Sequence, residues 1–458
     1  MQLQRLELKN FRGFAERSIT FHPNFNVLIG TNGTGKTSVL EGAAVALGAW
    51  LQGFPGSDTR NIRIRDVRRI EQESGERFRL LSQYPVEVFA QAVMSLPQID
   101  QSSSNPVDVT WMRSLDSQGG RTTQTGSHQL RKYARAAAQA ILEGTTITLP
   151  VIRYFGAGRL WESVRQSEKR KRIVNLKHIS EVEDDQDIST AEKMSDPFYG
   201  YKMSLDKRAS PTDLVRWIGE ERRNEIDLER PSTALNLVYK AILSMLPELS
   251  AVRYELRRKS LLVEQNGLVT GFEDMSDGYR NIIAMTADIA IKMTMLNPHL
   301  RGNALTETPG VVLIDELDLH LHPTWQRRVA EDLRRTFPCV QFICTSHSPF
   351  IVQSLRSGSE LIVLDGQPTA ETANMTIEEV AEGLMRVENA EVGGRYLAMK
   401  DTARKLLEAM EKSDLSSREK FDEFQRRLAA EVSPYADNPA YQAFLEMKLA
   451  KHFPSDTK

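Results

Sequence analysis

The chain has 458 residues, of which 40% are hydrophobic and 26% are charged, enough for a large core and one to three domains. A net charge of -2 gives no overall basic character that would favour nucleic-acid binding, although a local basic patch is compatible with it. The N-terminus lacks the apolar run of a signal peptide, and no stretch approaches the roughly 20 apolar residues of a membrane helix, so we expect a cytoplasmic protein without membrane contact.

The N-terminal third combines predicted strands with a predicted helix. Residues 3–11 alternate apolar and polar side chains in part, residues 25–30 form a short apolar run that ends in glycine, and residues 38–51 carry apolar side chains at helical spacing. Strand, strand, loop and helix are therefore expected over residues 1–48. Further strands are indicated at residues 85–93, 107–112 and 149–155, and a helix at residues 130–142.

The middle of the chain is more charged. The basic run Lys169–Arg172 precedes the acidic run Glu181–Asp187. Opposite charge runs this close are typical of a solvated or mobile segment, and a basic nucleic-acid contact is the alternative. Residues 253–272 are predicted to form a β-hairpin with Asn266 and Gly267 at its turn. Helices are predicted at residues 212–221 and 233–246.

The last part of the chain begins with the order helix, strand, helix, strand and strand. Residues 310–317 and 340–346 contain continuous apolar runs, which are typical of parallel strands buried on both faces. Charged helices follow. The expected organisation is a discontinuous core of residues 1–162 and 248–370, a charged helical insertion at residues 163–247, and a helical C-terminal region at residues 371–458.

The segment Gly30–Thr37 reads GTNGTGKT and matches the phosphate-loop pattern GxxxxGK[ST] between a predicted strand and a predicted helix. Its glycines allow backbone N–H groups to curl around phosphates, and the helix N-terminus adds a positive dipole. Lys36 can reach the β- and γ-phosphates of ATP, and the Thr37 hydroxyl can bind Mg²⁺. The predicted nucleotide-binding residues of this loop are Asn32, Gly33, Gly35, Lys36, Thr37 and Ser38.

The predicted strand at Val311–Ile314 runs into Asp315 and Glu316. An apolar strand that ends in two carboxylates supplies the second half of a nucleotide site when a phosphate loop is also present. Asp315 is predicted to hold Mg²⁺ together with Thr37, and Glu316 to act as the general base that polarises the attacking water.

Four further segments resemble ABC-type ATPases of the RecF/SMC-like branch. Phe272–Tyr279, FEDMSDGY, resembles the signature motif of that family at Ser276 and Gly278, whereas Asp277 and Tyr279 depart from the transporter pattern. The resemblance implies that Ser276 and Gly278 contact the γ-phosphate held by a second copy of the chain. It also implies the following roles: a D-loop at Asp318, a switch histidine at His347 that joins Glu316 and Lys36 in catalysis, and a phosphate-binding arginine at Arg12 in the segment NFRGF.

The resemblance covers roughly residues 1–50, 145–162 and 250–366. It implies an α/β fold of the ABC-type P-loop NTPase kind, with a mixed N-terminal sheet, a parallel core sheet, a helical insertion and a helical C-terminal region. The implied cofactors are ATP and Mg²⁺. The implied assembly is a head-to-tail dimer, and such dimers are compatible with a higher oligomer. A Q-loop glutamine is not evident, and Gln91 and the segment around Arg159 both remain candidates.

Within this branch the chain resembles the stand-alone ATPases of bacterial anti-phage systems. Residues 149–161, the run MSDGYRN and residues 438–450 are similar to the PARIS ATPase family, AriA, in the first place and to the Septu ATPase family, PtuA, in the second. The resemblance implies a sensor or scaffold that controls a separate nuclease of the Toprim type, with a phage protein as the trigger. The alternative is a DNA-repair ATPase of RecF type that binds DNA directly.

Overall fold

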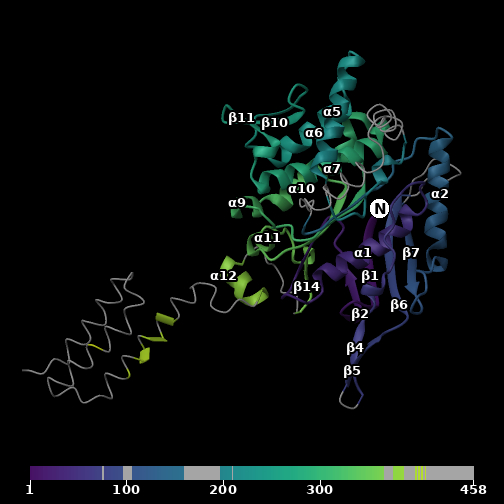
Figure 1. Cartoon of the computed structure of the whole chain (residues 1–458), viewed down its shortest axis with the longest axis vertical. Helices are drawn as coiled ribbons and strands as arrows, with labels where there is room; N and C mark the ends of the chain where they lie inside the picture. Colours follow the sequence, from purple (N-terminus) through teal and green to yellow (C-terminus); the bar gives the residue numbers. More distant parts are fainter. Residues whose placement is uncertain are drawn as a thin grey trace, which may run out of the picture. The chain divides into compact units, whose positions relative to one another are not determined.

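The structure is a computed structural model that describes residues 1–74, 77–95, 106–158, 196–208, 210–365 and 375–385, with single positions between residues 398 and 426. The chain divides into two compact units, Met1–Val380 and Ala381–Lys458. The first unit contains most of the described residues (Figure 1). The predicted charge runs of the insertion and nearly all of the predicted C-terminal helices lie outside the described residues.

A five-stranded parallel sheet forms the centre of the first unit, in the order β14-β3-β13-β12-β8. Every residue of β3, β8, β12 and β13 is buried, which explains their nearly continuous apolar sequences. The predicted α/β fold with a parallel core sheet is confirmed. The strands are β14 (Leu361–Val363), β3 (Phe25–Ile29), β13 (Val340–Thr345), β12 (Gly310–Ile314) and β8 (Val151–Phe155).

A four-stranded sheet contains the N-terminus, in the order β2-β1-β6-β7. It was expected to be mixed, but all three of its pairings are antiparallel. For β1 and β2 the reason is local, since their two-residue connection of Arg12 and Gly13 permits only an antiparallel hairpin. The strands are β1 (Gln2–Phe11), β2 (Phe14–Thr20), β6 (Val86–Ser95) and β7 (Pro106–Leu115).

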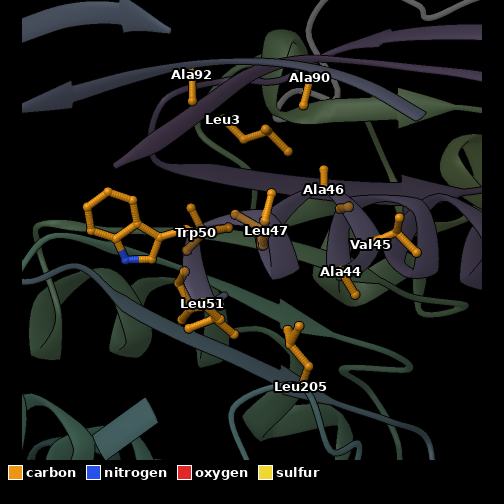
Figure 2. Packing of buried hydrophobic residues seen from close by; sticks show 14 of the residues in the cluster. Leu3, Ala44, Val45, Ala46, Leu47, Trp50, Leu51, Ala90, Ala92 and Leu205 are labelled. Carbon is orange, nitrogen blue, oxygen red and sulfur yellow. The ribbon is translucent and has the colours of Figure 1, made fainter. Parts of the chain in front are cut away.

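Helix α1 (Lys36–Leu51) packs between these two sheets and contacts β1, β6 and β7 of one and β12 and β13 of the other. Almost every residue of the helix is buried, so it carries apolar side chains on all sides. Figure 2 shows Ala46 and Leu47 near Leu3 of β1 and Ala90 of β6, with Leu205 on the opposite side of the helix. The phosphate loop at its N-terminus is therefore fixed to both sheets.

The region before the predicted signature forms a second antiparallel sheet, in the order β11-β10-β9. The predicted hairpin is confirmed for β10 (Ser260–Gln265) and β11 (Leu268–Gly271). Asn266 and Gly267 have positive φ angles of 51° and 78°, as a tight hairpin turn requires. A third strand, β9 (Ala251–Glu255), adds to the hairpin.

Helices cover the core sheet and the second antiparallel sheet (Figure 1). Helices α5 (Pro211–Asp227) and α6 (Thr233–Met245) begin at Ser210 and Ser232, whose hydroxyls accept capping hydrogen bonds from backbone N–H groups. Helix α7 (Asp277–Leu296) packs against α5, α6 and β8. Among the residues that the structure describes, no helix is long and apolar enough to cross a membrane.

The remaining elements complete the described part of the chain. They are η1 (Ile64–Asp66), β4 (Arg69–Ser74), β5 (Arg77–Ser82), η2 (Thr125–Ser127), α2 (His128–Leu142), η3 (Tyr199–Tyr201), η4 (Phe272–Asp274), η5 (Pro298–Asn303), α8 (Ala304–Glu307), α9 (Pro323–Gln326), α10 (Val329–Thr336), α11 (Pro349–Gln353), η6 (Gly358–Glu360), α12 (Ile377–Glu379) and the π-helix η8 (Val380–Leu384).

Candidate functional site

The phosphate loop lies where the sequence placed it, between the end of β3 and the start of α1. Gly35 has a φ angle of 97°, and a Cβ atom at this position would collide with the ring of Phe14 in β2. Glycine is therefore required here both for its backbone conformation and for space. Asn32 and Gly33 are exposed at the tip of the loop, and Ser38 is in the first turn of α1.

Lys36 lies inside the loop, where its ammonium group donates hydrogen bonds to the carbonyl oxygens of Gly30 at 2.6 Å and Thr31 at 3.1 Å. Burial lowers the pKa of Lys36 from its ordinary value, and neighbouring carboxylates act in the opposite direction. These carboxylates belong to Asp365, Asp315, Glu316 and Asp318. A lysine near several carboxylates is the arrangement expected of a site that binds a phosphate group and a divalent metal ion together.

Asp315, directly after β12, joins the phosphate loop to the core sheet. Both of its carboxylate oxygens lie 3.1 Å from the hydroxyl oxygen of Thr37. The Thr345 hydroxyl at the end of β13 donates a third hydrogen bond to this carboxylate at 2.7 Å. A hydroxyl and a carboxylate in contact are hard oxygen ligands of the type that Mg²⁺ prefers, so these residues fit that ion.

Glu316 has a φ angle of 52°, a left-handed conformation that is uncommon for residues other than glycine. Its backbone N–H donates to the Thr345 hydroxyl at 2.7 Å, which fixes this conformation. Backbone strain that the surrounding structure holds in place is frequent at functional sites. Thr345 therefore contacts both predicted acidic residues, and its role was not predicted from the sequence.

His347 and Asp318 lie next to each other after β13 and β12. The backbone N–H of His347 donates to the Asp318 carboxylate at 3.2 Å, and the residue is exposed. The Asp318 side chain thereby connects the predicted D-loop to the predicted switch histidine. Both follow the carboxyl ends of parallel strands, where ligands bind in open α/β sheets.

The predicted signature lies at the N-terminus of α7. Ser276 is the N-cap residue, is exposed, and makes no side-chain capping hydrogen bond within the described residues. Gly278 is buried, and a Cβ atom there would lie 2.7 Å from the carbonyl oxygen of His320. The ring of Tyr279 packs edge-on against Trp325, with 4.5 Å between centroids. The signature is thus attached to the segment that follows Asp318.

Arg12 was predicted to bind phosphate, but the structure pairs it with carboxylates of its own chain. Its guanidinium lies 2.9 Å from Asp66 and 3.3 Å from Glu41, a fully buried residue of α1. Burial by itself would raise the pKa of Glu41, but Lys207, Arg12 and Arg60 together lower it to about 2. For Arg12 to reach a phosphate, these ion pairs have to be exchanged.

Asp365 is a part of this site that sequence reasoning missed. It follows β14, and its carboxylate accepts hydrogen bonds from the backbone N–H and the hydroxyl of Thr31, both at 2.8 Å. The signal was present, since an apolar run ends in Asp365 just as one ends in Asp315. Gln91 lies in β6 opposite Arg5, and Arg159 lies outside the described residues, so the Q-loop stays undecided between them.

A model of the family described as AAA domain matches residues 5–237, which is more than half of the chain. A second model of the AAA domain type matches residues 153–353. Between them the two matches include the phosphate loop, Asp315, Glu316 and His347.

The curated relatives include proteins named as retron probable ATPases and as Septu proteins. The retron Vc95 probable ATPase of Vibrio cholerae serotype O1 biovar El Tor is 24% identical over 392 residues, which are 78% of this chain and 72% of that protein. The retron Ec83 probable ATPase of Escherichia coli is 39% identical over 136 residues, which are 30% of this chain and only 25% of that protein. The Septu protein PtuA of Bacillus mycoides (strain KBAB4) is 41% identical over 95 residues, which are 21% of this chain and 13% of that protein.

Among solved structures, the crystal structure of the SmcHead bound to the C-winged helix domain of ScpA is similar to this chain at 15% sequence identity, with a TM-score of 0.43. The similarity covers 79% of this chain and 94% of that one.

Proposed function

The chain belongs to the AAA domain family and is an ATPase, and we propose that it hydrolyses ATP at sites shared by two copies and thereby controls a separate effector of an anti-phage defence system. The observation that carries the first part is the contact between Thr37 and Asp315 at 3.1 Å. It brings the phosphate loop and the acidic strand end, which are far apart in sequence, to one edge of the core sheet.

The roles proposed for the phosphate loop and the strand end follow from these contacts. Lys36 exchanges its bonds with loop carbonyls for bonds to the β- and γ-phosphates. Burial disfavours the charged form of Lys36 and so lowers its pKa, and an anionic phosphate stabilises that charge better than a neutral carbonyl does. Thr37 and Asp315 hold Mg²⁺, which supplies positive charge to the phosphate oxygens when it is bound.

Water activation is proposed for Glu316. Its backbone conformation is held by Thr345, so the backbone that carries the carboxylate is fixed before substrate arrives. His347 is exposed next to Asp318 and is proposed to contact the γ-phosphate. Arg12 is proposed to bind phosphate after release from Glu41 and Asp66.

Completion of the site by a second copy is proposed from the signature. Ser276 is exposed at the N-terminus of a 20-residue helix, and its hydroxyl is not used for capping within the described residues. Such a terminus favours an anion. We propose that it binds the γ-phosphate held by the partner in a head-to-tail pair.

The defence role is proposed from the names of the relatives, above all the retron Vc95 ATPase, whose match extends over most of both chains. ATP can bias an assembly between two states only where its contacts differ between them, and a composite site provides such a difference. An effector that reads the two states is therefore proposed as the partner, specifically a Toprim-type nuclease with a phage protein as the trigger. The finer assignment to the PARIS ATPase AriA rests on the resemblance of residues 149–161 and 438–450.

The test uses the purified chain, a Glu316→Gln variant, and a control variant Glu307→Gln with the same chemical change on α8. Glu316→Gln should bind ATP with wild-type affinity and lose about 10²- to 10⁴-fold in kcat, because the amide is not a base. Glu307→Gln should match wild type. Undiminished kcat in Glu316→Gln would reject the assigned base.

The effector part is tested by coexpression with the product of the neighbouring gene. A stable complex is expected, and the ATPase chain by itself should cleave no nucleic acid. Nuclease activity of the isolated chain that is insensitive to Glu316→Gln would contradict the proposed division of labour.

A further inference from the structure

The proposed switch histidine lies on a short loop between two buried serines. His347 is exposed, whereas Ser346 and Ser348 on either side of it are 1% and 4% exposed. The backbone N–H of Ser348 donates to the Ser346 hydroxyl at 2.9 Å, which closes a side-chain turn around the histidine. The backbone N–H of Ser346 donates to the carbonyl oxygen of Leu28 in β3 at 3.3 Å. The loop therefore begins at a fixed point of the core sheet.

A hydrogen bond to α9 fixes the end of this loop. The Ser348 hydroxyl donates to the Oε1 atom of Gln326 at 2.6 Å. As the N-cap of α11, the same hydroxyl accepts from the backbone N–H of Ile351 at 3.3 Å. A serine hydroxyl has one hydrogen to donate, and here Gln326 receives it. The bond joins α11 to α9, two elements that are separated by α10 and β13 in the sequence.

The orientation of the Gln326 amide follows from its two partners. Its Nε2 atom donates to the carbonyl oxygen of Leu321 at 2.8 Å, and a carbonyl oxygen can only accept. The Oε1 atom is therefore the one that faces the Ser348 hydroxyl. Leu321 is itself tied to the predicted D-loop, since its backbone N–H donates to the carbonyl oxygen of Asp318 at 3.0 Å. Gln326 thus connects the segment after Asp318 to the loop that carries His347.

Two hydrogen bonds attach the histidine loop to the segment Asp318–Gln326. The bond from the backbone N–H of His347 to the Asp318 carboxylate is 3.2 Å long and exposed. The bond from the Ser348 hydroxyl to Gln326 is 2.6 Å long and partly buried. A short hydrogen bond with less access to water is electrostatically stronger than a long, solvated one. Gln326 is therefore the tighter of the two restraints on the loop.

Gln326 is itself held in place by the residues next to it. Trp325 packs edge-on against Tyr279 of the predicted signature. Arg327 lies over the ring of Phe350 in α11, with 5.1 Å from the guanidinium carbon to the ring centroid. A residue can position another group only if its own side chain is supported in this way.

We propose that Gln326 is a positioning residue for His347, which it places relative to the γ-phosphate by holding Ser348. The inference rests on the role proposed for His347 in ATP hydrolysis. A misplacement of about 1 Å in a group that acts on the reacting atoms can cost about 100-fold in rate. Loss of the Gln326 amide should therefore lower turnover. It should leave ATP affinity unchanged, because the phosphate loop provides most of the contacts to the nucleotide.

The test measures ATP hydrolysis and ATP binding by the full chain with Gln326→Met, which keeps the length of the side chain and removes both hydrogen bonds. We expect kcat to fall about 10-fold and the dissociation constant of ATP to stay within about 2-fold of wild type. Gln353→Met is the matched control, because Gln353 is also half-buried but donates to the carbonyl oxygen of Met375 at 3.0 Å. This control should hydrolyse ATP as wild type does. Equal losses of kcat in the two glutamine variants would overturn the proposal.

Combination with His347→Ala separates positioning from general support of the fold. If Gln326 acts through the histidine, Gln326→Met should lower kcat by less than about 2-fold in the His347→Ala background. A full further loss in that background would overturn the proposal. Wild-type kcat in His347→Ala would reject the role proposed for the histidine, and the inference with it. A loss in His347→Ala together with wild-type kcat in Gln326→Met would overturn the inference alone.

Two substitutions of Ser348 approach the same hydrogen bond from the loop. Ser348→Ala removes the donor and should reproduce the loss of kcat expected for Gln326→Met. Ser348→Thr retains the hydroxyl and should keep most of the activity. Wild-type kcat in Ser348→Ala, or equal losses in both Ser348 variants, would overturn the proposal. This pair decides the matter if Gln326→Met does not fold.

Discussion

The carboxylate of Asp365 accepts hydrogen bonds from both the backbone N–H and the hydroxyl of Thr31, each at 2.8 Å. Thr31 is the second residue of the phosphate loop, and Asp365 is the last described residue before the C-terminal part of the chain. Of the acids around Lys36, Asp365 is the one that most opposes the lowering of its pKa. A negative charge thus lies beside the place where phosphates are expected.

Replacing Asp365 by asparagine should tighten ATP binding about 3- to 10-fold, because one unit of repulsion against the phosphates is removed while an amide oxygen can still accept from Thr31. The dissociation constant of ATP, measured by calorimetry, checks this. Glu307→Gln, which neutralises a carboxylate on α8, should leave the constant unchanged. Weaker ATP binding in Asp365→Asn would show that the carboxylate supports the nucleotide-binding loop instead of opposing its ligand.

The sequence was sufficient to predict the features that are continuous along the chain. The phosphate loop and the acidic strand end were recognised because each lies within eight or fewer consecutive residues and in a definite strand or helix context. The parallel core sheet followed from its nearly continuous apolar strands. Asp315 contacts the phosphate loop through Thr37 and lies near Lys36, while the roles of Lys36 and Asp315 toward ATP and Mg²⁺ stay predictions.

Contacts that join distant segments were not predictable in the same way. Thr345 acts on Asp315 and Glu316 only because β13 pairs with β12, a register that periodicity does not define. Arg12 matches a family motif, but its actual partners Glu41 and Asp66 depend on how a loop packs against α1. Both cases concern side chains brought together by tertiary packing.

Thr345→Val should reduce kcat about 10- to 100-fold with little change in ATP affinity. The substitution keeps the shape but removes the hydroxyl that donates to Asp315 and accepts from the N–H of Glu316, both at 2.7 Å. An unpaired N–H and a less constrained carboxylate then disturb the positioning of the base. Steady-state kinetics and ATP binding are the measurements. Thr345→Ser retains the hydroxyl and should keep most of the activity, so equal losses in the two variants would assign the effect to packing.

Glu41→Gln should destabilise the protein by about 3 to 5 kcal/mol at neutral pH, because it removes a fully buried carboxylate that pairs with Arg12, Arg60 and Lys207 and leaves Asp66 as the carboxylate partner of the two arginines. The pKa of Glu41 is lowered to about 2, from an unfolded value of 4.5. Its contribution to stability is therefore complete above pH 4.5 and is lost as the pH falls through about 2, a change of about 3 kcal/mol in the free energy of unfolding.

The measurement for Glu41 is urea unfolding at several pH values between 5 and about 3, with linear extrapolation to water. Wild type should lose stability over this range more steeply than Glu41→Gln does. Glu7→Gln is the matched control, since Glu7 forms an exposed pair with Arg5 that is expected to contribute little. Parallel pH profiles for wild type and Glu41→Gln would mean that Glu41 keeps an ordinary pKa in the folded chain.

Mixing two inactive variants should restore ATP hydrolysis if each site takes its phosphate loop from one copy and its signature from the other. Lys36→Ala damages the first component and Ser276→Arg the second, so a mixed pair has one intact site and one doubly damaged site. An equal mixture should recover about a quarter of wild-type activity if sites act independently and copies pair at random. The matched control mixes Lys36→Ala with Glu316→Gln. Both of these lie on the phosphate-loop side, every site then contains one defect, and no recovery is expected. Recovery in the control as well, or none in the test mixture of well-folded chains, would argue against sites shared head to tail.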